Sequence, residues 1–263
     1  MAIDSSLWVA DLPSGTYNVG DVVELKCVDG PVNVRSGRGR AVLKNIFVAS
    51  FNGANYWRIH VKNSDWIDEV ISFTNPFNND LVLDPQSGCS QDCHDCALMP
   101  NSSWQIYAEC IQTGAAADNS IFALIDIDYP DVSAVEDPTK AVGYPTSLDY
   151  DVTVPTYAYG AMSSAAWVGQ SVDYFKAGYR YVLDRVESFG TAVVGFIAFS
   201  NAAGMGGLQR IVPFTHHING PRFSIKYSSA LVKGPMEIKV KAFTTSAGSQ
   251  TIHFVHDYVK RVG

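Results

Sequence analysis

The sequence is poor in charge and in the signals of membrane or secreted proteins. Charged residues make up 17% of the 263-residue chain, below the roughly 25% of an average soluble domain. The net charge of −7 argues against nucleic-acid binding driven by overall charge, and we expect no sequence-specific nucleic acid partner. No apolar run approaches the roughly 20 residues of a membrane span. The N-terminus lacks the basic and apolar regions of a signal peptide, so we expect synthesis inside a cell.

Common catalytic and cofactor motifs are also missing. The chain has no P-loop, no Gly-x-Gly-x-x-Gly dinucleotide fingerprint and no His-Glu-x-x-His helix. It also lacks the His-x-His spacing of a cupin-like metal site, and His253 and His256 lie three apart, on opposite faces of any strand. We therefore expect a protein that is not an enzyme and that carries no cofactor.

What the sequence does contain is strand signal. In residues 22–28, Val23, Leu25 and Cys27 alternate with Glu24 and Lys26, which predicts a half-buried strand. Residues 103–110 alternate in the same way. No window of a dozen residues shows a helical period, so we expect an all-β chain.

Local signals predict the connections. Asn52-Gly53, between strands at 41–51 and 56–61, is typical of a hairpin turn. A long polar loop is expected over residues 74–101. Residues 1–20 indicate an arm or a first edge strand.

The strand series appears twice. Leu43 and Leu183 stand 140 positions apart in similar strands, and Phe73 and Phe214 stand 141 apart. Two later matches continue the series: residues 104–107 with 223–226, and 120–126 with 251–257. A long-period repeat of this kind predicts two units of similar fold.

The repeat and the strand spacing predict two tandem jelly-roll β-sandwiches. About seven or eight short strands per half, with turns every 8–12 residues, is the pattern of such sandwiches. Prolines and glycines interrupt residues 130–165, which indicates the connection between the halves. We therefore expect a first jelly roll with an N-terminal arm at 1–138, a linker at 139–165 and a second jelly roll at 166–263.

On these two strand series, 40–132 and 180–259, the chain resembles a double jelly-roll major capsid protein of a tailless icosahedral virus. That lineage includes adenovirus and several membrane-containing bacterial and archaeal viruses. The resemblance covers most of the chain and is one of architecture, without a diagnostic motif. It implies a structural virion protein that forms trimers of pseudo-hexagonal outline and tiles an icosahedral capsid, after synthesis in the host cytoplasm.

The resemblance also implies partners. These are two further copies in a homotrimer, neighbouring capsomers, penton or minor capsid proteins, and an internal membrane contacted by extended chain ends. The low charged fraction agrees with such a role, because surfaces that become interfaces are depleted of charge at their centres.

A cluster of three cysteines, Cys89, Cys93 and Cys96, is the densest set of metal-ligand types in the chain. Zinc requires four ligands, commonly from paired Cys-x-x-Cys elements, and no second pair is present. Three hypotheses stay open for these residues: a metal site, a loop disulfide, or free thiols in an ordered loop. The odd total of five cysteines argues against a fully paired secreted framework.

Two charged groups invite a binding interpretation. Asp126 and Asp128, with Asp131 nearby, have the spacing of a calcium site or a glycosidase acid–base pair, although solvated strand ends are more common. The basic turn formed by Arg35, Arg38 and Arg40 fits a phosphate contact, an inter-subunit salt bridge or simple solvation.

Two other functions compete with a capsid role. A carbohydrate-binding or adhesion β-sandwich module would use exposed aromatic residues. The candidates are Tyr56, Trp57, Trp66, Tyr157 and Tyr159. An enzyme built on two jelly rolls is the third hypothesis, and the missing His-x-His pair argues against it.

Overall fold

A computed structural model describes most of the strands of the chain and few of its longer connections. The described residues are 3–12, 17–51, 56–65, 89–113, 119–133, 144–154, 168–171, 180–189, 193–200, 209–215, 223–233, 237–244 and 250–262. They form fifteen strands and one four-residue helical turn, α1 (Pro130–Ser133). The prediction of an all-β chain is confirmed. Among these residues no helix is long and apolar enough to cross a lipid bilayer.

The first half, residues 3–133, forms one curled sheet of seven strands. Its strands are β1 (Ile3–Leu12), β2 (Val22–Asp29), β3 (Ala41–Phe51), β4 (Tyr56–Asn63), β5 (Cys89–Leu98), β6 (Trp104–Gln112) and β7 (Asn119–Asp128). The spatial order is β4-β6-β2-β1-β7-β3-β5, and every pair is antiparallel. The β1–β2 pairing joins the group β4-β6-β2 to the group β1-β7-β3-β5.

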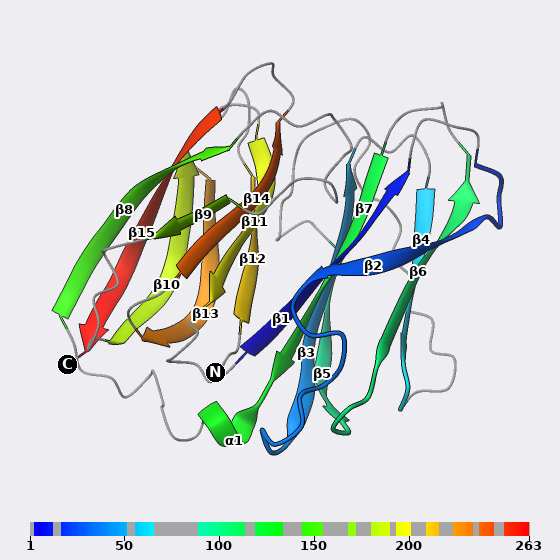
Figure 1. The fold of residues 1–263 in the computed structure, drawn as a ribbon, viewed down its shortest axis with the longest axis horizontal. Coiled ribbons are helices and arrows are strands. Elements are labelled where there is room, and N and C mark those ends of the chain that lie inside the picture. The colour runs from blue at the N-terminus through cyan, green and yellow to red at the C-terminus, as the bar shows by residue number, and fades with distance from the viewer. Residues whose placement is uncertain are drawn as a thin grey trace.

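The second half, residues 144–262, forms two four-stranded sheets. Its strands are β8 (Tyr144–Val154), β9 (Val168–Ser171), β10 (Arg180–Phe189), β11 (Val193–Ser200), β12 (Gln209–Thr215), β13 (Phe223–Lys233), β14 (Glu237–Thr244) and β15 (Gln250–Val262). The sheet orders are β13-β10-β15-β8 and β12-β11-β14-β9. Figure 1 shows the two halves side by side, with β1 next to β12.

Both halves have the strand order of a jelly roll. When the eight strands of the second half are counted along the chain, its sheets read 6-3-8-1 and 5-4-7-2. The first strand thus pairs with the last and the second with the seventh, as in a long hairpin rolled on itself. The seven described strands of the first half read 4-7-2 joined to 1-8-3-6 when β5, β6 and β7 are matched to the sixth, seventh and eighth strands of the second half.

The topology confirms part of the predicted repeat and corrects one match. The segments at 40–51 and 180–189 are the third strand of each half, and those at 120–126 and 251–257 are the last. The match of 104–107 with 223–226 is wrong. Strand β6 lies between β2 and β4, as β14 lies between β9 and β11, whereas β13 is an edge strand beside β10. The counterpart of β6 is therefore β14. The two halves share few identical residues, so the sequence comparison matched β6 to β13 instead of to the next strand, β14.

The predicted Asn52-Gly53 hairpin is also wrong. Strand β3 pairs with β5 and β7, while β4 pairs with β6 at the far edge of the curled sheet. A turn signal specifies a local change of direction, but pairing follows from which neighbours bury the apolar face of each strand. Strand β3 belongs to the group β1-β7-β3-β5, and the next strand, β4, belongs to the group β4-β6-β2.

Three expected connections contain strands. Residues 3–12, expected as an arm or an edge, form β1 in the middle of the sheet, where all residues from Ile3 to Ala10 are buried. Within the expected loop 74–101, β5 pairs with β3. Within the expected linker 139–165, residues 144–154 form β8, which pairs with β15. The division of the chain into two domains and a linker stays a prediction.

The core of the first half follows the predicted alternation. Leu25 is buried between exposed Glu24 and Lys26, and in β6 the residues from Trp104 to Cys110 are buried at every second position. Each fully buried large apolar side chain contributes about 1.5–3 kcal/mol. The buried cluster comprises Trp8, Ala10, Leu25, Val34, Ala41, Leu43, Ile46, Val48, Trp57, Ile59, Val61, Leu98, Trp104, Ile106, Ala108, Cys110, Ile121, Ala123, Ile125, Ile127 and Tyr129.

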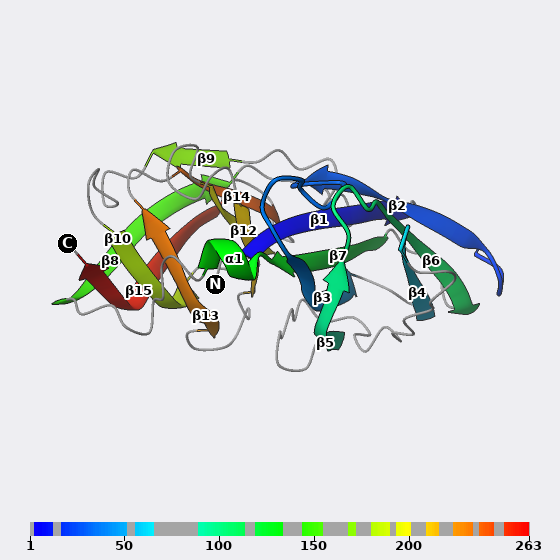
Figure 2. The same cartoon turned by 90° about the horizontal axis from the view of Figure 1, so that it is seen from below.

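The opposite face of the central strands is buried too. Phe122 of β7 and Phe196 of β11 are both fully buried, and their rings meet edge to face at 4.9 Å between centroids. Phe47 of β3 lies beside Phe122 at 6.1 Å. The seven-stranded sheet therefore packs its own core on one face and the second half on the other. Figure 2 shows α1 and the N-terminal end of the chain between the halves.

One glycine is required by close packing. Gly30 has φ of +90°, and a Cβ there would overlap the backbone of Ser5 and Ser6 in β1. We expect Gly30→Ala to lower the free energy of unfolding by at least about 3 kcal/mol, since backbone strain and overpacking add. Gly20→Ala is the matched control, because Gly20 has φ of +94° with nothing within 4 Å, and it should lose only about 1–2 kcal/mol. Urea unfolding of both variants checks this, and equal losses would contradict the role of the β1 contact.

Candidate functional site: the junction between the halves

Three consecutive polar residues, Asp4, Ser5 and Ser6, lie in the buried strand β1. A buried polar group destabilises the fold unless it forms hydrogen bonds. The Ser5 hydroxyl donates to Oδ1 of Asp126 at 2.7 Å. The Trp8 indole N–H donates to Oγ of Ser6 at 3.0 Å. These bonds explain how a Ser-rich segment occupies the centre of a sheet.

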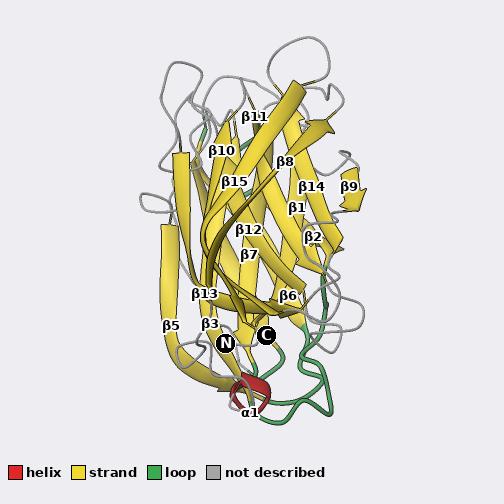
Figure 3. Cartoon of the chain, turned by 90° about the vertical axis from the view of Figure 1, so that its left-hand side faces the viewer, coloured by secondary structure: helices red, strands yellow, loops and turns green. Residues whose placement is uncertain are grey.

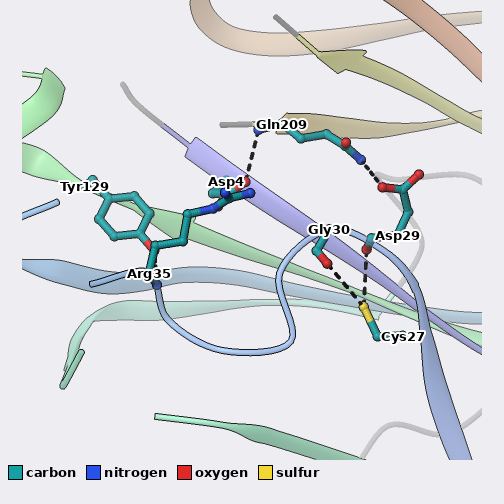
Figure 4. Close-up of polar contacts among 7 residues, drawn as sticks. All are labelled: Asp4, Cys27, Asp29, Gly30, Arg35, Tyr129 and Gln209. Carbon is teal, nitrogen blue, oxygen red and sulfur yellow. Dashed lines mark hydrogen bonds and ion pairs between the residues drawn. The ribbon is translucent and has the colours of Figure 1, made fainter. Parts of the chain in front are cut away.

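The Asp4 carboxylate is the centre of a polar cluster between the halves (Figure 4). Its side chain is completely buried. Oδ1 accepts a hydrogen bond from the backbone N–H of Gln209 at 3.0 Å, and Oδ2 accepts one from Nε of Arg35. Asp4 thus binds one residue of each half, and the Arg35 guanidinium compensates its charge.

The loop that carries Arg35 is anchored by backbone hydrogen bonds. The N–H of Val34 donates to the carbonyl of Ser102 at 2.9 Å, and the N–H of Asn101 donates to the carbonyl of Val34 at 2.9 Å. The N–H of Arg35 donates to the hydroxyl of Tyr129, just after β7, at 2.9 Å. Burial raises the pKa of the Tyr129 hydroxyl, so this group is neutral at physiological pH.

Gln209, the first residue of β12, reaches the first half at two points. Besides the main-chain bond to Asp4, its side-chain Nε2 donates to Oδ1 of Asp29 at 2.8 Å. Asp29 is the last residue of β2. Both acceptors are carboxylates, and hydrogen bonds to charged acceptors are stronger than those between neutral groups.

The two cysteines with described side chains act as small apolar residues. Cys110 is buried in the core of the first half. Cys27 is half-buried, and its thiol donates to the carbonyls of Asp29 and Gly30 at 3.4 and 3.7 Å. Burial raises the pKa of the Cys27 thiol to about 11. Since the thiolate is the reactive form, this raised pKa lowers the reactivity of Cys27 towards oxidants and metal ions at neutral pH.

The predicted cysteine cluster lies in β5 and not in a loop. The backbone places Cys89 opposite Val48 and Cys96 opposite Leu43, with an irregular register between them. The side chains of Cys89, Cys93 and Cys96 fall outside what the structure describes. The metal, disulfide and free-thiol hypotheses therefore stay predictions.

The predicted carboxylate group is divided. Asp126 and Asp128 share a face of β7 but are buried, at 4% and 6% exposure, so the expectation of solvated strand ends is wrong for them. Asp131 instead accepts from the backbone N–H of Arg40 at 2.7 Å. In the part of the chain that is described, no group of three or more His, Cys, Asp or Glu residues has metal-binding geometry.

The basic turn is used within the chain. Arg35 pairs with Asp4, which argues against the expected inter-subunit salt bridge for this residue.

A cluster of charged residues on β4 and β6 was not predicted from the sequence. Nε2 of His60 lies 2.7 Å from Oε2 of Glu109, and a guanidinium nitrogen of Arg58 lies 3.6 Å from the same oxygen. Cross-strand pairs of this kind become visible only when the register of β4 and β6 is known.

The junction residues Asp4, Asp29 and Gln209 carried no sequence motif either. A signal was present in β1, where polar residues interrupt an apolar strand that continues to Leu12. Gln209 stands 205 positions from Asp4 and 180 from Asp29, too far for a local pattern.

Comparison with known proteins gives viral structures as neighbours. No protein-family model and no curated protein matches the sequence. VP2 of infectious bursal disease virus, solved as a subviral particle, is similar over 99% of this chain and 77% of its own, with 9% identity and a TM-score of 0.26. STIV MCP is similar over 97% of this chain and 96% of its own, with 8% identity and a TM-score of 0.24.

The titration of Asp4 gives a prediction with a defined sign. Burial raises the pKa of Asp4 above its ordinary value of 3.8, more than the bonds from Gln209 and Arg35 lower it; Arg38 also lowers it. The stabilising contribution of the protonated carboxyl is therefore complete below pH 3.8 and is lost as the pH rises through the raised pKa. Relative to Asp4→Asn, the unsubstituted protein should gain unfolding free energy as the pH falls from 7 towards 4.

Urea unfolding of both proteins at several pH values measures this difference. Asp65→Asn is a suitable control because Asp65 is exposed and lies outside the junction. If the unsubstituted protein instead lost stability relative to Asp4→Asn on acidification, the ion pair with Arg35 would outweigh burial, contrary to the expectation.

Proposed function

We propose that this protein is a structural viral capsid protein that trimerises into pseudo-hexagonal capsomers and tiles an icosahedral shell. The observation that carries the proposal is the jelly-roll strand order, which occurs in both halves of one chain. Two similar sandwiches per subunit give a trimer six similar sides. One type of chain can then fill a hexagonal lattice by closed, symmetric contacts.

The arrangement of strands and chain ends supports this role. In Figure 3 most strands run along the long dimension of the view, and both chain ends lie towards the end that carries α1. A shell subunit with upright sandwiches would therefore present both ends on one side of the shell. We propose that this side faces the interior, where extended ends would meet neighbouring subunits or an internal membrane.

The role we propose is non-enzymatic. Its partners are two further copies of the chain, neighbouring capsomers, and penton or minor capsid proteins, and its location is the virion after synthesis in the host cytoplasm. The net charge of −7 supports contacts with protein more than with nucleic acid.

A carbohydrate-binding role receives less support from the geometry. Trp57, one of the aromatic residues expected to be exposed, is 1% exposed and packs edge to face on Tyr17 at 5.4 Å between centroids. A ring in the core offers no face to a sugar. The side chains of Tyr56, Trp66, Tyr157 and Tyr159 lie outside the described residues.

Light scattering of the purified protein tests the proposal. We expect a particle with three times the mass of the 28.6-kDa chain, or a larger shell fragment, and a hexagonal outline in negative-stain images. The same sample in urea above the unfolding midpoint gives the monomer mass as a control. A monodisperse monomer at every concentration, without lattices in negative stain, would contradict the proposal, and a glycan screen would then test the binding module.

A further inference from the structure

The two halves meet through an apolar contact and a polar contact. Phe122 and Phe196 form the apolar contact, with rings inclined at 85° and both side chains fully buried. Apolar burial contributes stability roughly in proportion to area and has little directional preference. Apolar burial therefore holds the halves together, but it selects their orientation less strictly than directional bonds do.

The polar contact lies some distance from the apolar one. Gln209 pairs with Ser200 of the neighbouring strand β11, four residues along that strand from Phe196. At the usual rise of a strand, four residues span about 13 Å. At this distance Gln209 forms its two hydrogen bonds, from the main chain to Asp4 and from the side chain to Asp29. Hydrogen bonds weaken steeply when they are bent, so these two bonds resist rotation about the aromatic contact.

We propose that Gln209 is a latch that holds the second half in one orientation on the first. The main-chain N–H binds the carboxylate at the start of β1, and the side-chain amide binds the carboxylate at the end of β2. Arg35 acts as a positioning residue, because it fixes the Asp4 carboxylate from the side of the first half. The latch is a property of the folded chain and does not depend on the proposed capsid role.

The chemistry of the latch requires an amide at position 209. Replacement by glutamate keeps the size of the side chain but replaces the donor to Asp29 by a second carboxylate. Two facing carboxylates repel, and the hydrogen bond is lost. Substituting Asp29→Asn in the same chain restores an amide–carboxylate pair with the donor on the other side.

Hydrogen exchange of the folded protein, followed by mass spectrometry, measures opening of the latch. In Gln209→Glu we expect exchange to accelerate about tenfold or more in the peptides covering 3–12 and 209–215. Exchange in 237–244, which lies inside the sheet of the second half, should not change. The double variant Gln209→Glu/Asp29→Asn should return exchange towards the unsubstituted rate.

Gln105→Glu is the matched control, because Gln105 is an exposed strand residue of β6 away from the junction, and it should leave all three peptides unchanged. Three results would overturn the proposal: no acceleration in Gln209→Glu, an equal acceleration in 237–244, or a double variant that exchanges as fast as Gln209→Glu alone. An equal acceleration would mean that Gln209 supports the second half itself and not its attachment.

Discussion

The rest of the structure depends on the burial of β1 and β7 on both faces. Every residue from Ile3 to Ala10 and from Ile121 to Tyr129 is buried. Strands of this kind have no solvent to satisfy their polar side chains, so each one requires a partner inside the protein. Asp4, Ser5 and Ser6 meet this requirement with bonds to Arg35, Asp126 and Trp8, and Asp4 extends it to the second half through Gln209.

The same constraint explains why the two halves pack against each other. An isolated first half would expose Phe122 and the rest of an apolar sheet face to water. Covering that face with β11 and its neighbours removes the exposed apolar area, and the carboxylates at the edge restrict how the cover is placed. In a shell built from two similar units per chain, the angle between the units decides whether six sides can close into a ring. A junction that combines non-directional burial with directional bonds is suited to such a task.

Several elements could be predicted because their signals are local. The alternation of apolar and polar residues predicts β2 and β6, for example at Leu25, Glu24 and Ile106. The structure confirms it, because successive side chains of a strand point to opposite faces, only one of which is buried here. The prediction of a hairpin at Asn52-Gly53 was wrong, because the pairing partners of β3 and β4 are strands far away in the chain. Strand β5 was hidden for a related reason, since Cys89–Leu98 is polar and becomes a strand by pairing with β3.

The sequence by itself determined the all-β class, the repetition of a strand series and the burial period of individual strands, because these depend on neighbouring residues and on composition. Only the tertiary structure decided which strands pair, that residues 144–154 belong to a sheet, and that Asp4, Asp29 and Gln209 meet. The physical reason is that pairing and docking are set by the total apolar area removed from water and by the satisfaction of every buried polar group. Both quantities are sums over contacts between distant residues, and no local pattern encodes them.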